Sequence, residues 1–154
     1  MTGAEAPPER ILCDTSFVSV KQAAAARPTV VAHWPSEVTA RLDRAILSVS
    51  VVTLAELRGG QIAVGFSPER VERDRKLIDT YLHVPLDLEV SETWAHLSVW
   101  AKRQGRGIGD NDLWIAATAA SRGWPLVGCD RHFIGLPDLE YLYLQRKPDS
   151  RPGR

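Results

Sequence analysis

The sequence predicts a single α/β domain, in which a central parallel sheet of four to five strands is flanked by helices. Two observations carry this prediction. Short apolar segments alternate with longer segments of helical periodicity, the pattern of a parallel sheet covered on both faces. The chain has 154 residues, 44% apolar and 25% charged, as expected for a globular protein with one core. No internal repeat or second domain is evident.

The first third of the chain contains two predicted strands and three predicted helices. Thr15 and Ser16 can cap the first helix, and Pro35 suits the first turn of the second. Thr53 opens the third helix, which Gly65 ends because glycine favours the left-handed conformation. The elements expected before Thr53 are a strand at 10–14, a helix at 16–26, a helix at 34–44 and a strand at 45–50.

The remainder of the chain repeats the alternation of helices and strands. Ser67, Pro68 and Glu69 are a helix start, since a serine cap, an early proline and an acid suit the first turn. Pro85 places its strand at a sheet edge, because proline has no amide hydrogen to donate. The expected elements are helices at 67–81, 91–104 and after Asp112, and strands at 83–86, 126–129 and 139–144.

The ends of the chain differ from the segment between them. Residues 10–144 are predicted to form the domain, after a flexible leader at 1–9 and before a basic, proline-rich tail at 145–154. The leader lacks the apolar core of a signal peptide, and no apolar run is long enough to span a membrane. With only Cys13 and Cys129, no disulfide scaffold is indicated, and we expect a reducing cytoplasm.

Acidic side chains follow the predicted strands. Asp14 ends the first strand, Glu56 lies one turn into the helix after the second, and Asp130 follows the strand at 126–129. Asp112, at the start of the preceding helix, is a fourth. Ligands of parallel sheets bind at the carboxyl ends of strands, so these acids are expected to converge. Converging carboxylates repel one another and need a cation.

A hard divalent cation fits such a group best. Carboxylate oxygens suit Mg²⁺ or Mn²⁺, and neither histidine nor cysteine is placed by the sequence to recruit zinc. One or two such ions would support attack of water on a phosphodiester bond. The acids therefore predict metal-dependent phosphoryl hydrolysis, whereas the 19 basic and 19 acidic residues by themselves neither indicate nor exclude a nucleic-acid substrate.

Each acid except Asp14 also has a structural interpretation. Glu56 could complete a capping box with Thr53. Asp112 could cap its helix, a task that Asp110 or Asn111 could also take, and Asp110 could serve as an outer acid of the site. Asp130 could be a turn residue.

Histidine and tryptophan add two further alternatives. His132 could be a general base, although lone histidines are more often structural. Trp34 is a candidate for an exposed partner contact.

Four segments, at 12–16, 50–57, 111–120 and 126–133, resemble the PIN-domain nucleases in order, spacing and flanking apolar residues, and in particular the VapC-type toxins of prokaryotic toxin–antitoxin pairs. The resemblance implies an α/β/α fold, Mg²⁺- or Mn²⁺-dependent endoribonuclease activity, a small antitoxin and frequent homodimers. It assigns Asp14, Glu56, Asp112 and Asp130 to the catalytic, metal-binding positions and Thr15 or Ser16 to the small polar position beside the first acid.

The chain departs from the family at Gly128, where threonine or serine is common, and at Cys129, often asparagine or arginine. For phosphate or antitoxin contacts, Arg103, Arg106 and Arg131 are the first candidates. A stand-alone housekeeping or repair nuclease and a catalytically silent partner-binding module remain alternative functions.

Overall fold

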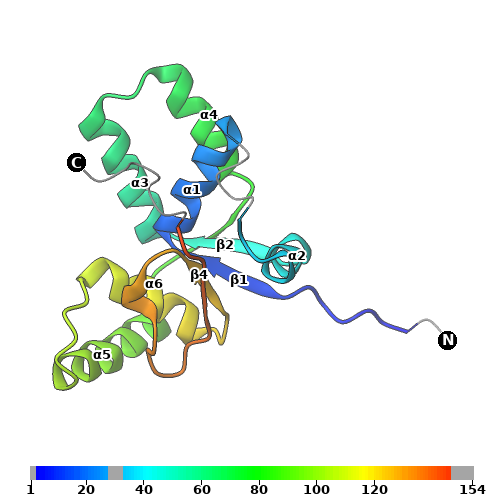
Figure 1. Cartoon of the computed structure of the whole chain (residues 1–154). Helices are drawn as coiled ribbons and strands as arrows, with labels where there is room; N and C mark the ends of the chain where they lie inside the picture. Colours follow the sequence, from blue (N-terminus) through cyan, green and yellow to red (C-terminus); the bar gives the residue numbers. More distant parts are fainter. Residues whose placement is uncertain (1–2, 28–32, 147–154) are drawn as a thin grey trace, which may run out of the picture.

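Five parallel strands form one central sheet (Figure 1). The computed structural model describes residues 3–27 and 33–146. The strands run in the order β3-β2-β1-β4-β5, and every neighbouring pair is parallel. This confirms the predicted parallel sheet and its strand count. The strands are β1 (Arg10–Cys13), β2 (Ile46–Ser50), β3 (Leu82–Val84), β4 (Leu126–Gly128) and β5 (Tyr141–Tyr143).

Helices cover both faces of the sheet. In Figure 1, α1, α3 and α4 lie above the strands, and α5 and α6 pack together below them. The helices are α1 (Thr15–Ala26), α2 (Ser36–Arg44), α3 (Val51–Val64), α4 (Pro68–Ile78), α5 (Leu88–Arg103) and α6 (Asp110–Ser121), with a short 3₁₀ helix η2 (Arg131–Phe133) after β4.

The alternation of side chains along β1 divides the core into two layers. Ile11 and Cys13 are fully buried against Phe17 of α1, whereas Leu12 points to the opposite face and packs with Ile115 of α6. Successive side chains of a strand point to opposite faces, so an apolar strand flanked by helices on both sides must be apolar throughout.

The strand order fixes where a ligand site can form. From β1 the chain crosses to β2 and β3 on one side, whereas β4 and β5 lie on the other. The crevice between β1 and β4 is therefore the topological switch point, and its carboxyl edge carries Asp14 after β1 and Asp130 after β4.

Two predicted helix caps are wrong. The side chain of Asp14, rather than Thr15 or Ser16, caps α1 by accepting a hydrogen bond from the Phe17 amide. Helix α3 begins at Val51 with Ser50 as its cap, so Thr53 is inside the helix and fully buried. A cap is chosen by where the strand ends, which an apolar run leaves uncertain by a few residues.

Several other element boundaries and the exposure of one tryptophan also differ from the predictions. Helix α5 starts three residues early because Asp87 caps it, and α2 starts at Ser36 with Pro35 as its cap. The outer strands β3 and β5 are shorter than predicted at both edges of the sheet. Trp34 is 7% exposed and stacks on Phe17, so it is a core residue rather than an exposed partner contact.

The predicted leader and tail fall partly outside the described residues, which omit 1–2, 28–32 and 147–154. Within the leader, Glu9 forms an ion pair with Arg41 of α2, and its carbonyl oxygen accepts a hydrogen bond from the Ile46 amide. Among the helices that the structure describes, none is both long and apolar enough to cross a membrane.

Candidate metal-dependent active site

The Asp14 carboxyl group is the buried part of the site. Asp14 is 2% exposed, and its Oδ1 accepts hydrogen bonds from the Phe17 amide at 2.8 Å and the Ser16 hydroxyl at 2.7 Å. Ser16 in turn accepts a hydrogen bond from the Cys129 amide at 2.8 Å. The end of β4 therefore orients Asp14 through Ser16, which is the role of a small polar neighbour.

Glu56 reaches the same edge from α3. Its Oε1 accepts a hydrogen bond from the Thr15 hydroxyl at 2.7 Å, and its Oε2 lies 3.4 Å from the Asn111 amide nitrogen. The capping-box alternative therefore fails, since Glu56 contacts α1 and α6 rather than the backbone of Thr53. Asn111, considered from the sequence only as a cap, instead connects α6 to Glu56.

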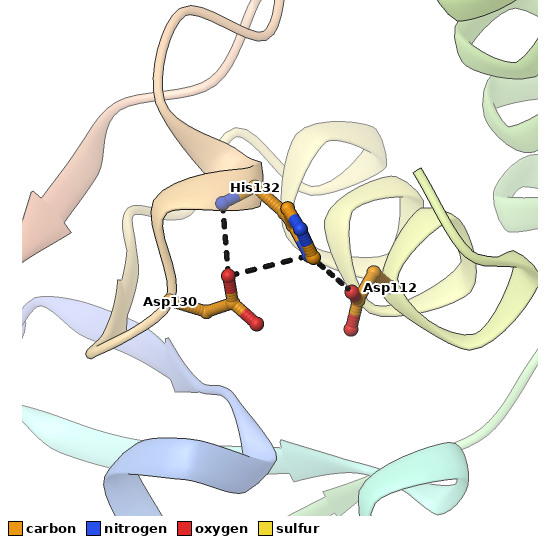
Figure 2. Close-up of side chains that lie close together, drawn as sticks. All are labelled: Asp112, Asp130 and His132. Atoms are coloured by element: carbon orange, nitrogen blue, oxygen red, sulfur yellow. Dashed lines mark hydrogen bonds and ion pairs between the residues drawn. The ribbon is translucent and has the colours of Figure 1, made fainter. Parts of the chain in front are cut away.

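Asp112 and Asp130 meet at His132 (Figure 2). The Nδ1 atom of His132 lies 3.3 Å from Asp112 Oδ2 and 3.3 Å from Asp130 Oδ1. One donor atom from each of the three residues falls within 4.8 Å of the others, which suits a single metal ion. Asp14 and Glu56 are not members of this group. Of the four predicted acids, Asp112 and Asp130 are therefore brought together at His132, whereas Asp14 and Glu56 lie outside this group.

His132, which the sequence left open as a general base or a structural residue, lies within 3.3 Å of both acids. His132 lies on η2, which begins directly after Asp130 because the Asp130 side chain accepts a hydrogen bond from the His132 amide at 2.9 Å. That short turn folds the imidazole back toward Asp112. The only sequence signal was the spacing of two residues after an acid at a strand end.

Asp110 and Asp112, the two candidate acids at the start of α6, also differ in position. Helix α6 has Gly109 as its cap, with no side-chain hydrogen bond at that cap, so neither acid performs the capping task. Asp112 points to His132, whereas Asp110 is exposed and outside the three-residue group.

The acids affect one another electrostatically. The pKa of Asp14 is raised to about 6, mainly by burial and to a smaller extent by the charges of Asp130 and Asp112, whereas the hydrogen bonds from Ser16 and Phe17 lower it. Burial also raises the pKa of Asp112, with His132 opposing and the charges of Asp130 and Glu56 contributing. The four carboxyl groups are thus close enough for their charges to affect the pKa values of Asp14 and Asp112, although they do not all contact one another. A cation would relieve this repulsion.

Two side chains that the sequence did not assign to this task hold the turn after β4. The Tyr141 hydroxyl donates to the Asp130 carbonyl oxygen at 2.7 Å and accepts from the Asp130 amide at 3.2 Å. Arg106 donates to the carbonyl oxygens of His132 and Ile134 at 2.8 and 3.0 Å. The positions of Asp130 and His132 thus depend on β5 and on the loop before α6.

The three arginines considered for phosphate contact have different surroundings. Arg106 is committed to the backbone of the η2 segment, as above. Arg131 lies 3.4 Å from the Tyr143 hydroxyl, next to the three-residue group. Arg103, at the end of α5, lines a separate cavity together with Glu92. Of the three, Arg131 is therefore the best placed for a substrate at the acids.

The PIN domain family model matches residues 11–139. The chain belongs to the PIN domain family. Ribonuclease VapC5 of Mycobacterium tuberculosis is 37% identical over 102 residues, which are 62% of this chain and 76% of that protein. Ribonuclease VapC1 of Haemophilus influenzae is 31% identical over 120 residues, which are 75% of this chain and 84% of that protein.

The comparison with solved structures also points to VapC-type proteins. The crystal structure of VapBC-5, a toxin–antitoxin system of M. tuberculosis, superposes with a TM-score of 0.63 and 26% identity, and the match covers 89% of this chain and all of that chain. Within the PIN family, the chain therefore groups with the VapC-type toxins, as the four sequence segments indicated.

Gly128, where the resemblance to the family led us to expect threonine or serine, lies against Asp14. A Cβ atom at this position would overlap the Asp14 carboxyl group. The glycine at the end of β4 therefore provides the space that the carboxyl group occupies. A side chain here would push Asp14 from its hydrogen bonds with Phe17 and Ser16. Gly128 has no hydroxyl group to offer the site, but it leaves the space that the Asp14 carboxyl group occupies.

The donor set fits a divalent metal. Asp112, Asp130 and His132 supply two carboxylate oxygens and one imidazole nitrogen, and Asp14 lies at the same sheet edge as a buried carboxyl group whose pKa is raised by burial. Oxygen donors with one nitrogen are compatible with Mn²⁺, and the carboxylates with Mg²⁺.

Proposed function

We propose that this protein is a Mg²⁺- or Mn²⁺-dependent endoribonuclease and the toxin of a type II toxin–antitoxin pair. The observation that carries the proposal is the meeting of Asp112, Asp130 and His132 beside buried Asp14, at the switch point of a PIN fold. The ribonuclease names of VapC5 and VapC1 support RNA as the substrate.

The proposed roles follow from the geometry. Asp112 and Asp130 would hold the ion, with His132 as a neighbouring ligand or as the group that orients both acids. Asp14 would be deprotonated when a cation is present, because the added positive charge opposes the effect of burial. A bound ion would polarise the phosphodiester and lower the pKa of the attacking water.

Glu56 would act beside these groups. The hydroxyl of Thr15 and the amide of Asn111 fix its two carboxylate oxygens, so its position is set before substrate arrives. Such preorganisation contributes to catalysis because the group does not have to be ordered during the reaction.

A small antitoxin is the expected protein partner, since the similar solved structures are described as toxin–antitoxin systems and complexes. We also expect a homodimer acting in the cytoplasm. A housekeeping nuclease would lack the antitoxin, and a silent binding module would lack metal affinity.

The deciding experiment incubates the purified protein with total RNA and maps the new ends by sequencing. Cleavage should require Mg²⁺ or Mn²⁺, stop with a chelator and disappear in Asp14→Asn. Asp43→Asn is the matched control, because Asp43 is an exposed acid on α2, which precedes the amino end of β2, and the proposed site lies at the carboxyl ends of the strands. Full cleavage by Asp14→Asn would refute the proposal, and absence of Mn²⁺ binding in calorimetry would favour the silent module.

A further inference from the structure

A cavity of about 450 Å³ continues from the proposed active site between α1, α3 and α4. Thr15 and Glu56, which contact each other, line one end of it. Figure 1 shows the same three helices together on one side of the sheet. The cavity is thus an extension of the site and not a separate pocket.

Three arginines also line this cavity, Arg27 after α1 and Arg70 and Arg73 on α4, together with Asp74. Arg73 lies 3.7 Å from Asp74, which is buried and also 3.3 Å from the Gln61 amide, so part of its charge is balanced. Over the described ranges 3–27 and 33–146, neither Arg27 nor Arg70 has a carboxylate within ion-pair distance.

An aromatic ring accompanies the arginines. The guanidinium carbon of Arg70 lies 3.5 Å from the centroid of the Phe66 ring, and both residues line the cavity. Arginine and aromatic planes stack on nucleobases, while guanidinium groups contact phosphates. A peptide carboxylate would use the charges but not the stacking surface, so a nucleic-acid strand uses more of the lining.

The helix beside the cavity leaves room for such a strand. Gly60 of α3 lines the cavity, and a Cβ atom built on it meets no atom within 4 Å. A glycine inside a helix costs stability relative to alanine, so its benefit lies in the space it leaves.

We propose that this cavity holds the RNA strand on one side of the scissile phosphate, with Arg27, Arg70 and Arg73 at backbone phosphates and the Phe66–Arg70 pair stacked on a base. The inference rests on the proposed ribonuclease function and extends it by naming the path of the substrate.

Two independent changes test it. Arg70→Gln/Arg73→Gln removes charge, with Lys76→Gln as control, because Lys76 is on the same helix but does not line the cavity. Gly60→Leu fills space, and its Cβ atom meets no neighbour within 4 Å; Gly59→Leu is the control, because Gly59 is adjacent, equally open at Cβ and outside the lining. Neither Gly59 nor Gly60 has a left-handed backbone conformation, and both variants replace glycine by a better helix former.

Binding of a fluorescein-labelled single-stranded RNA of mixed sequence is measured by anisotropy over a salt series, with Asp14→Asn in every variant to prevent cleavage. Both cavity variants should bind roughly tenfold more weakly than their controls. The arginine variant should also lower the slope of log affinity against log salt by about 0.7 for each RNA phosphate that the protein no longer neutralises. Arg70→Lys/Arg73→Lys should restore that slope, which separates charge from folding.

Cleavage without the Asp14 change separates this inference from the proposed function. The cavity variants should raise KM with little change in kcat and no change in Mn²⁺ affinity. Cleavage with a KM equal to that of the controls would overturn the cavity proposal alone. Absence of any cleavage by the unsubstituted protein would overturn the ribonuclease function instead. Weaker binding of a polyglutamate peptide, with RNA binding unchanged, would assign the cavity to an acidic protein segment and overturn the RNA path.

Discussion

Asp14 and the group formed by Asp112, Asp130 and His132 lie at the same edge of the sheet but are held in place differently. Asp14 is buried, and hydrogen bonds from Phe17 and Ser16 fix it from its own helix. The three other side chains are half-buried or exposed, and their strongest contacts are to one another.

This difference shows two ways to build one acidic site. The buried half depends on local backbone geometry, where β1 passes into α1, and it carries a large desolvation cost. The exposed half depends on contacts between segments far apart in the chain, so it adjusts more easily when an ion or substrate binds. We expect changes in the buried half to affect stability and metal binding together, and changes in the exposed half to affect mainly metal binding.

Asp112→Asn should have the largest effect on metal binding. Removing a ligand charge should lower Mn²⁺ affinity at least about 100-fold, or about 3 kcal/mol. Asp110→Asn is the matched control, since Asp110 is two residues away on the same helix but outside the group. Calorimetric titration with Mn²⁺ measures both. Equal losses in the two variants would show that Asp112 has no direct role.

The buried half should respond to pH. An unfolded carboxyl group loses its proton near its ordinary pKa of 3.8, whereas Asp14 in the metal-free folded protein, with its pKa raised to about 6, retains the proton to higher pH. The folded state therefore binds more protons between these values, so its stability falls as pH rises through this window, by up to about 3 kcal/mol.

The measurement is urea unfolding of the metal-free protein across this pH range, compared with Asp14→Asn. Asparagine remains a good helix cap and carries no charge, so the variant should lose this part of the pH dependence and gain stability at pH 7. Parallel pH curves for the two proteins would contradict the assignment.

Gly128→Ala should connect the two effects. The added Cβ overlaps the Asp14 carboxyl group, so the acid must move and lose hydrogen bonds, at a cost of about 1–3 kcal/mol. We expect Mn²⁺ affinity to fall about 10- to 100-fold, with far-UV circular dichroism unchanged. Gly107→Ala is the control, because a Cβ atom there meets nothing within 4 Å. Wild-type Mn²⁺ affinity in Gly128→Ala would show that Asp14 does not need this space.

Tyr141→Phe should give the smallest loss. The hydroxyl holds the backbone of Asp130 by two hydrogen bonds, and removing it should cost about 1 kcal/mol and a few-fold in cleavage rate. Tyr143→Phe, on the same strand, removes a hydroxyl that contacts Arg131 instead. A loss in Tyr143→Phe as large as in Tyr141→Phe would point to a general effect on β5 rather than to positioning of Asp130.

The parallel α/β architecture could be predicted from the sequence, and so could the acids at the ends of its strands. Apolar strands, helical periodicity and acids at strand ends are local patterns, each visible within about ten residues. Asp14 and Glu56 were identified this way, as was the edge position of the strand before Pro85. Sequence alone left the capping alternatives for Glu56 and Asp112 open, because a cap and a ligand use the same residue types.

Which of these groups contact one another depends on the tertiary fold. Strand order placed Asp130 across from Asp14, the η2 turn brought His132 to Asp112, and packing of β5 placed the Tyr141 hydroxyl on Asp130. The space above Gly128 exists only once β1 and β4 are paired. These are contacts between residues distant in the chain, and periodicity along one segment carries no information about its neighbour in space.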